Sequence, residues 1–177
     1  MCAHEITGLV IPVPAAETLL TSVAERHPDA ARGGVPAHVT VLFPFLHPDK
    51  IDDGVLHTLQ ELFDRHQPMP VRFTECRRRE EFVYLHPEPV DGLRRLTDEA
   101  RQHWPDVIPY EGAYSEVEPH LTISIRTTED TAARIHHESG QNLPISTELR
   151  EGWLISSRGE QWIVQERLPF GGQTEKS

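Results

Sequence analysis

The amino-acid sequence predicts an α+β fold with two related lobes, and three observations lead to this prediction. Runs of residues typical of strands and helices alternate in the same order twice, over residues 8–76 and 81–157. The chain has 177 residues, a length that suits one domain. No segment of flexible-linker composition separates the two runs. We therefore expect a single bilobal domain over residues 1–170, a duplicated pseudo-twofold unit with repeats at about 8–78 and 81–168.

In the first repeat, β-branched and aromatic residues mark the strands, and apolar residues three and four apart mark the helices. Asp52 and Asp53 fall in the first turn of the second helix, where the helix dipole favours acidic side chains. The predicted elements are a strand at 8–14, a helix at 15–26, a strand at 37–45, a helix that opens at 48–49 and stops before Pro68, and a strand at 71–76.

The second repeat follows the same order. Thr127 or Thr128 can cap its second helix, with acidic residues in the first turn. Each lobe then carries an antiparallel sheet with helices on its outer face, and a groove lies between the lobes. We expect residues 171–177 to form a disordered tail. The predicted elements are a strand at 81–86, a helix that ends near Trp104, a strand at 119–125, the Thr-capped helix, and a closing hairpin of strands 145–157 and 160–168.

The composition is that of a globular protein with an acidic surface. Apolar residues make up 37% and charged residues 25%, and 17 Lys and Arg against 28 Asp and Glu give a net charge of −11. Binding to long nucleic acids depends on Lys and Arg that displace counterions, so we expect no long nucleic acid as a partner. No apolar run approaches the roughly 20 residues that span a bilayer, and we expect no membrane partner.

The cysteines and the N-terminal residues bear on the compartment. Cys2 and Cys76 are too few for a disulfide framework and lack the spacing of a zinc site. The first residues lack the basic and apolar regions of a signal peptide. We therefore expect a cytoplasmic protein, and a monomer.

One short pattern occurs in the matching strand of each repeat. It is His-apolar-Thr-apolar, at residues 38–41 (His-Val-Thr-Val) and 120–123 (His-Leu-Thr-Ile). One copy is expected by chance about 0.1 times in a chain of this composition, so two copies at equivalent places in a repeat are a strong signal. Side chains two residues apart on a strand share a face, so each His points the same way as its Thr. Ser124 is expected on the same face of the strand as His120 and Thr122.

The residue types in these motifs indicate phosphate chemistry. If the lobes face each other, His38, His120, Thr40 and Thr122 converge in the groove. A neutral imidazole can take a proton, and a protonated imidazole can give one. Both forms exist at neutral pH because the ordinary pKa of His is about 6.5. Thr hydroxyls can donate hydrogen bonds to phosphate oxygens. These groups suit acid–base cleavage of a phosphodiester, with no metal and no other cofactor expected.

The two motifs resemble the hallmark of the 2H phosphoesterase superfamily, the group of 2′-5′ RNA ligase-like proteins and cyclic phosphodiesterases. The resemblance covers essentially the whole chain through the repeat and rests on the two tetrapeptides. It implies that one of His38 and His120 is a general base and the other a general acid, in either order, and that Thr40 and Thr122 position the phosphate. The implied reaction opens a 2′,3′-cyclic phosphate, or an ADP-ribose 1″,2″-cyclic phosphate, on a nucleotide or an RNA end.

Two other functions fit the same residues. Some members of the family that the motifs resemble join RNA ends through a 2′-5′ bond, although a chain with a net charge of −11 offers little grip on a polynucleotide. A groove with these side chains can also bind a nucleotide or a phosphate without turnover.

Three side chains next to the motifs have two interpretations each. Arg126 shares the face of the second motif if its strand continues, but an exposed Arg at a strand end is the more common situation. Alternation places Phe43 and Phe45 on the packed face, which favours a role in the core over stacking on a base.

The remaining clusters favour structural roles. Residues 77–81, Arg-Arg-Arg-Glu-Glu, form the densest cationic cluster and predict a solvated hairpin turn rather than an anion site. His136 and His137 are adjacent and do not share a helical face, which argues against a metal there. Tyr84 and Tyr114 can line the groove or pack in the ordinary way.

Overall fold

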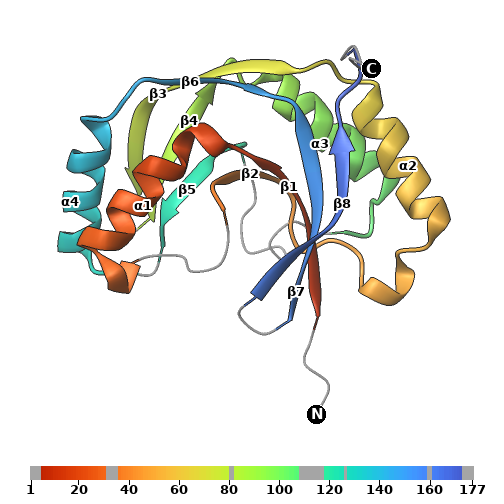
Figure 1. Cartoon of the computed structure of the whole chain (residues 1–177), viewed down its shortest axis with the longest axis horizontal. Helices are drawn as coiled ribbons and strands as arrows, with labels where there is room; N and C mark the ends of the chain where they lie inside the picture. The colour runs from red at the N-terminus through yellow and green to blue at the C-terminus, as the bar shows by residue number, and fades with distance from the viewer. Residues whose placement is uncertain are drawn as a thin grey trace.

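Eight strands form one antiparallel sheet in the computed structural model, which describes residues 5–30, 36–79, 82–107, 118–125, 127–158 and 161–172 (Figure 1). The strands run across the sheet in the order β6-β3-β4-β5-β2-β1-β7-β8, and every neighbouring pair is antiparallel. Their bounds are β1 Ile6–Pro12, β2 His38–Leu42, β3 Met69–Arg79, β4 Phe82–Glu88, β5 Leu121–Ser124, β6 Ile145–Leu149, β7 Glu151–Arg158 and β8 Gln161–Pro169.

Two pairs of α-helices lie beside the sheet in the described part of the chain. α1 packs against α4, which covers β3 and β4, while α2 packs against α3, and these two helices contact β8 and β2 (Figure 1). The helix bounds are α1 Glu17–Arg26, α2 Asp53–Asp64, α3 Asp91–His103 and α4 Glu129–Gly140, with 3-10 turns at Pro14–Ala16, Pro28–Ala30 and Pro48–Lys50.

The strand order is symmetric about its centre and confirms the predicted α+β fold of two related halves. We call β2, β1, β7 and β8 the β1 half, and β5, β4, β3 and β6 the β4 half. The halves meet where β2 pairs with β5, with Val39 opposite Leu121. The two predicted sheets are thus joined edge to edge into one, and β1-α1-β2 and β4-α3-β5 take equivalent places in it.

The chain crosses between the two halves several times. α1 follows β1 but lies with α4 beside the β4 half, and α3 follows β4 but contacts β2. The prediction of one strand over residues 145–157 is wrong, because Arg150 separates β6, which pairs with β3, from β7, which pairs with β1. The closing hairpin therefore consists of β7 and β8 alone.

One α-helix begins where the sequence predicts, and another begins later than predicted. The Asp52 carboxylate accepts a hydrogen bond from the Val55 N–H at 2.9 Å, which caps α2. The Thr128 hydroxyl accepts one from the Thr131 N–H at 3.2 Å, which caps α4. Pro48–Lys50, where the sequence predicts the opening of the second helix, instead forms a separate 3-10 turn before α2.

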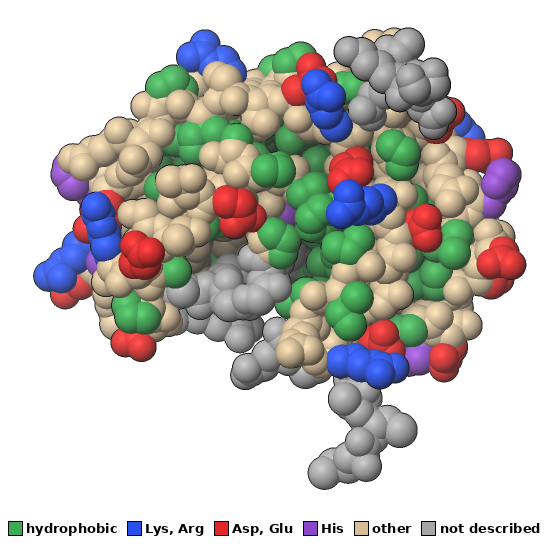
Figure 2. Space-filling model, viewed as in Figure 1, with side chains coloured by type: hydrophobic (Ala, Val, Ile, Leu, Met, Phe, Trp, Pro, Cys, Tyr) green, Lys and Arg blue, Asp and Glu red, His purple; other side chains and the backbone are tan. Residues whose placement is uncertain are grey.

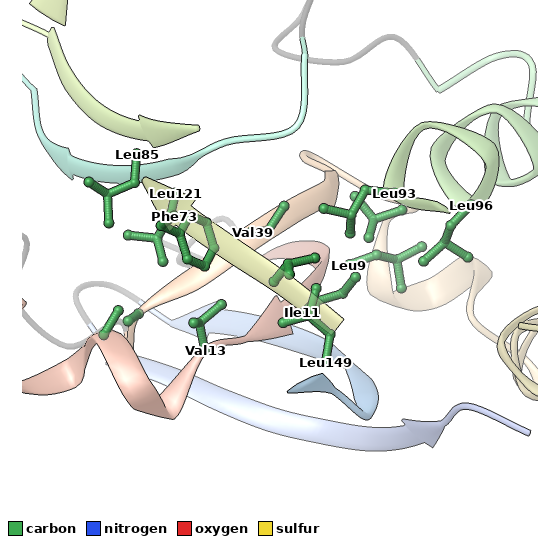
Figure 3. Close-up of a cluster of buried hydrophobic side chains, with 14 of the residues drawn as sticks. Leu9, Ile11, Val13, Val39, Phe73, Leu85, Leu93, Leu96, Leu121 and Leu149 are labelled. Carbon is green, nitrogen blue, oxygen red and sulfur yellow. The ribbon is translucent and has the colours of Figure 1, made fainter. Parts of the chain in front are cut away.

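The hydrophobic core lies between the sheet and the helices (Figure 3). Leu9 on β1 is fully buried beside Leu93 and Leu96 of α3. Val39 and Leu121, the apolar residues at the centre of the two motifs, belong to the same cluster. Burial of each such side chain stabilises the fold by roughly 1.5–3 kcal/mol, so the core holds the backbone of both motifs in place.

The first residue of the predicted disordered tail is bound to the rest of the molecule. Gly171, at the start of the predicted tail, donates its N–H to the carbonyl of His66 at 2.8 Å, while residues 173–177 lie outside the described residues.

Figure 2 shows a hollow between the two halves, bordered by hydrophobic side chains, with acidic and basic side chains spread over the rest of that face. Within the described ranges, no helix is both long and apolar enough to cross a membrane.

Candidate active site

The two His-apolar-Thr motifs lie side by side on β2 and β5, at the centre of the sheet. His38 and Thr40 are on β2, Thr122 is on β5, and His120 immediately precedes β5. The apolar residue between each His and its Thr is buried, whereas all four polar side chains are partly exposed. Each strand therefore fixes its apolar face in the core and presents His and Thr on the opposite face, as the sequence predicts.

The register of β2 against β5 brings the four side chains together, and we call them the His–Thr cluster. The central apolar residues of the two motifs lie directly opposite each other. One residue further along each antiparallel strand, His38 stands opposite Thr122, and Thr40 stands opposite His120. Directly opposed residues are roughly 4.5–5.5 Å apart and diagonal neighbours roughly 7–8 Å apart. The imidazoles thus occupy one diagonal of the cluster and the hydroxyls the other.

Both imidazoles are oriented by the same hydrogen bond. Nδ1 of His38 donates to the carbonyl of Pro36 at 2.7 Å, and Nδ1 of His120 donates to the carbonyl of Glu118 at 2.7 Å. A carbonyl oxygen only accepts, so each Nδ1 carries a proton. The lone pair of the neutral ring is then on Nε2, and in the protonated ring Nε2 also carries a proton. In the same orientation of the ring, Nε2 can therefore accept a proton when the imidazole is neutral and donate one when it is protonated.

Equivalent helices hold the backbone in front of the two histidines. In the first repeat, the Glu17 carboxylate at the start of α1 accepts a hydrogen bond from the Ala37 N–H at 2.6 Å. In the second repeat, Arg94 of α3 donates its Nε–H to the Glu118 carboxylate at 2.7 Å. Each motif is thus tied to the first helix of its own repeat.

A shift of strand register follows the Thr of each motif. The residue after Thr40 is skipped in the pairing with β1, and the residue after Thr122 is skipped in the pairing with β4. Because a bulge adds one residue to one strand, the residues beyond it point to the opposite face from the one that simple alternation predicts. Ser124 is therefore turned to the packed side and fully buried, so its predicted place beside the second motif is wrong. Phe43, predicted on the packed face, instead lies over Gly8 on the other face.

Two aromatic rings border His120, and sequence reasoning singled out only one of them. Phe82 and Tyr84 on β4 stack on each other, with ring centroids 4.9 Å apart, and meet the His120 ring edge-on at 5.4 and 5.6 Å. Tyr84 stands directly opposite Thr122. The two rings therefore pack against one side of the imidazole. Phe82 and Tyr84 are two residues apart on β4 and so share a face, and this spacing could have indicated both from the sequence.

The arginines at 77–79 belong to β3, so the prediction of a hairpin turn is wrong for these residues. Nε and Nη2 of Arg77 each lie 3.0 Å from the Glu75 carboxylate. Nη1 of Arg78 lies 4.0 Å from the carboxylate of Glu129 on α4. Pairing with β4 holds this charged segment in an extended conformation.

Several other residues considered from the sequence can be placed. Phe45 is buried and packs edge-on against Trp104 with ring centroids 4.9 Å apart, which confirms its predicted role in the core. Arg126 and Tyr114 lie outside the described residues, as do residues 80 and 81 of the charged run.

Titratable side chains near the sheet respond to burial. Burial, and after it the charge of Arg77, lowers the pKa of His86. Burial also raises the pKa of the Cys76 thiol to about 11. His136 donates its Nε2–H to the Cys76 carbonyl at 2.8 Å, and over the described ranges no group of three or more His, Cys, Asp or Glu side chains is placed to hold a metal ion.

Solved structures with the same fold share little sequence with this chain. LigT from E. coli, in complex with NADP+, is similar with a TM-score of 0.60 and 18% identity, over 96% of this chain and 99% of that chain. LigT in complex with 3′-AMP gives a TM-score of 0.62 at 16% identity, over 96% and 99%. TT0787 from Thermus thermophilus gives 0.62 at 15% identity, over 95% and 100%. These likenesses establish the fold.

The family follows from the sequence match rather than from these structures. No curated protein sequence matches the chain. The family model of the 2′-5′ RNA ligase superfamily matches residues 11–161, a segment that includes both His-apolar-Thr motifs. This match confirms the resemblance that the two motifs carry. The chain therefore belongs to the 2′-5′ RNA ligase superfamily, a group of 2H phosphoesterases.

Proposed function

We propose that the protein opens a 2′,3′-cyclic phosphate, or the related 1″,2″-cyclic phosphate of ADP-ribose, to a monoester by acid–base catalysis with His38 and His120. The observation that carries the proposal is the identical Nδ1–carbonyl hydrogen bond of the two imidazoles within one cluster. Membership of the superfamily supports phosphoester chemistry. The structures of LigT with 3′-AMP and with NADP+ support a nucleotide as the ligand.

The proposed step moves two protons. A water molecule attacks phosphorus while Nε2 of one His takes a proton from that water. The bond from phosphorus to one ribose oxygen breaks, and Nε2–H of the other, protonated His gives its proton to that oxygen. The products are a phosphate monoester and a ribose hydroxyl, and the two rings have exchanged protonation states. A diagonal of roughly 7–8 Å places the imidazoles on opposite sides of a bound phosphorus, which suits in-line displacement.

Thr40 and Thr122 form the other diagonal of the cluster. We assign them hydrogen bonds from their hydroxyls to the non-bridging phosphate oxygens, where negative charge gathers during the attack. Each Thr stands opposite the His of the other motif, so the phosphate is held by both halves of the sheet.

Ligation of RNA ends is the second candidate, and superfamily membership favours it. In that reaction the 5′-hydroxyl of a second RNA takes the place of water, attacks the cyclic phosphate and leaves a 2′-5′ bond beside a 3′-hydroxyl. Hydrolysis is the first choice because ligation also requires a site for a second polynucleotide, and the chain carries a net charge of −11.

The proposal is tested by hydrolysis of 2′,3′-cyclic AMP in the presence of EDTA, followed by phosphorus NMR. His38→Asn and His120→Asn keep an amide N–H near the backbone carbonyl but remove the group that titrates. We expect each variant to lower kcat by about 10²- to 10⁴-fold. The double variant should be little worse than either single one, because the two groups act in one step.

A control and three outcomes make the test decisive. His57→Ala removes an exposed histidine of α2 that pairs with Glu61 at 3.0 Å, and it should leave turnover unchanged. Full turnover in both Asn variants would exclude the histidine pair. Saturable binding of cyclic nucleotides without any product would indicate a binding protein, and a 2′-5′-linked product from RNA ends would favour ligation.

A further inference from the structure

The arginines of β3 alternate between the two faces of the sheet. Arg78 points toward α4, where the Glu129 carboxylate lies 4.0 Å away. Side chains of neighbouring strand residues point to opposite faces, so Arg77 and Arg79 point to the face that carries the His–Thr cluster. The sequence alone does not assign these arginines to different faces, because that assignment requires the knowledge that they belong to a strand.

The register places Arg77 and Arg79 in line with the cluster. Arg77 stands opposite Tyr84, which stands opposite Thr122, and Arg79 stands opposite Phe82. Neighbouring strands are roughly 4.8 Å apart, so the backbone of Arg77 is roughly 10 Å from that of Thr122. This distance leaves room for one sugar unit between a phosphate at the cluster and a phosphate at the arginines. The stacked rings of Phe82 and Tyr84 lie along that path.

Both arginine side chains on this side of the sheet are exposed. The Arg77 side chain is 45% exposed and lies 3.0 Å from the Glu75 carboxylate. Burial, and after it the charge of Arg77, lowers the pKa of His86, while Glu88, Glu118 and Glu75 act in the opposite direction. Arg79 is exposed, and in the described part of the chain no carboxylate oxygen lies within 4.0 Å of its guanidinium. These charges stand on a chain whose net charge is −11.

The β1 half offers no equivalent group at these positions. There the row that begins at Thr40 runs through Val10 to Trp153, both uncharged. Arg167 lies one strand further out, with its guanidinium 5.9 Å from the centre of the Trp153 ring and 3.9 Å from the Glu151 carboxylate. The two sides of the cluster therefore differ, because arginines stand on the β3 side and uncharged residues stand at the equivalent positions of the β1 half.

We propose that Arg77 and Arg79 bind a second phosphate of the substrate, so that the enzyme prefers a cyclic phosphate joined through one ribose to a further phosphate. This inference rests on the proposed function, which places the reacting phosphate at the His–Thr cluster. An RNA end supplies that second phosphate as a phosphodiester, and ADP-ribose 1″,2″-cyclic phosphate supplies it as a diphosphate. A mononucleotide such as 2′,3′-cyclic AMP has none.

The test compares kcat/KM for a dinucleotide that ends in a 2′,3′-cyclic phosphate with kcat/KM for 2′,3′-cyclic AMP. In the double variant Arg77→Gln/Arg79→Gln, we expect this ratio to fall about 10- to 100-fold, mostly through KM, because charge-assisted hydrogen bonds to the second phosphate are lost. The loss should shrink at high salt. Arg78→Gln/Arg134→Gln removes the same charge from the opposite face and from α4, and it should keep the ratio.

The outcomes separate this inference from the proposed function. An unchanged ratio in the Arg77→Gln/Arg79→Gln variant, with hydrolysis intact, would overturn the second phosphate site alone. A parallel assay with ADP-ribose 1″,2″-cyclic phosphate shows whether a diphosphate or a phosphodiester is preferred. If no cyclic phosphate were hydrolysed, calorimetry would compare a dinucleotide 3′-monophosphate with 3′-AMP. About 10-fold tighter binding of the dinucleotide, lost in the variant, would support the site, and equal affinities would refute it.

Discussion

The thiol of Cys76 lies against α4, and its environment sets its chemistry. Burial raises the pKa of this thiol from 9.0 to about 11, and the neighbouring Ser139 acts weakly in the opposite direction. A thiol with a raised pKa favours the folded state while it is protonated. That contribution is fully present below the ordinary value of 9.0 and is lost as the pH rises through the range between 9.0 and about 11.

The same shift predicts slow alkylation of Cys76. In a Cys2→Ser variant, Cys76 is the remaining thiol of the chain. Because only the thiolate reacts, we expect iodoacetamide to label the folded variant about 100-fold more slowly near pH 8 than the urea-unfolded variant. Mass spectrometry over time gives both rates. Equal rates in the two states would contradict the effect of burial.

At the scale of single residues, the sequence predicts what depends on a local pattern. The His and Thr of each motif could be found because their spacing alone puts them on one face of a strand. Ser124 and Phe43 could not, because their faces depend on bulges, and a bulge is a property of two paired strands. The contact of Phe82 with His120 likewise depends on the register of β4 against β5.

At the scale of elements, β7 passes close to α2 at Gly152. A Cβ atom at this position would lie 2.8 Å from Cζ and 2.9 Å from Cδ1 of the Phe63 ring, which is closer than atoms can pack. We expect Gly152→Ala to lower the free energy of unfolding by roughly 1–3 kcal/mol, measured by urea unfolding. Phe63→Leu in the same chain should restore part of the loss, because it removes the ring atoms that clash.

Gly140 provides the matched control for Gly152. No atom lies within 4 Å of a Cβ built at Gly140, which is the last residue of α4. Gly140→Ala should therefore leave stability unchanged or raise it by up to about 1 kcal/mol. If Gly152→Ala were as stable as this control, the close approach of β7 to α2 would be wrong.

The elements differ in how far they could be predicted. Thr128 could be predicted as a cap of α4 because a cap involves only the next few residues. The sequence predicts the start of α2 at residues 48–49, but these form a separate 3-10 turn and Asp52 caps the helix instead. The break at Arg150 could not be seen, because residues on both sides of it favour strands equally well. The break exists because β6 and β7 find partners in different halves of the sheet.

At the scale of the whole molecule, no single cut of the chain separates the two halves. α1 lies with α4 beside the β4 half, and α3 contacts β2 in the β1 half. The duplication visible in the sequence predicts two related halves. It does not predict this interlocking, because the order of elements along the chain is the same whether a helix packs on its own half or on the other.

The interlocking predicts that the molecule unfolds as one unit. In a Trp104→Phe variant, fluorescence of the remaining Trp153 and Trp162 reports on β7 and β8, whereas far-UV circular dichroism reports on the helices of both halves. We expect the two signals to give the same urea midpoint in a single transition. A fragment of residues 1–79 should lack stable structure, since α1 and β3 would lose their partners. Two separate transitions, or a folded fragment, would contradict this expectation.

The crossing of α1 and α3 resembles the exchange of elements in a swapped dimer. Each repeat sends its first helix to the half that holds the central strand of the other repeat. Two separate copies of such a repeat would complete each other by exchanging helices, as swapped dimers do. The present chain shows this arrangement within one polypeptide. Because both repeats are parts of one chain, equivalent positions need not carry the same residue, and Arg77 stands on one side of the cluster while Trp153 stands on the other.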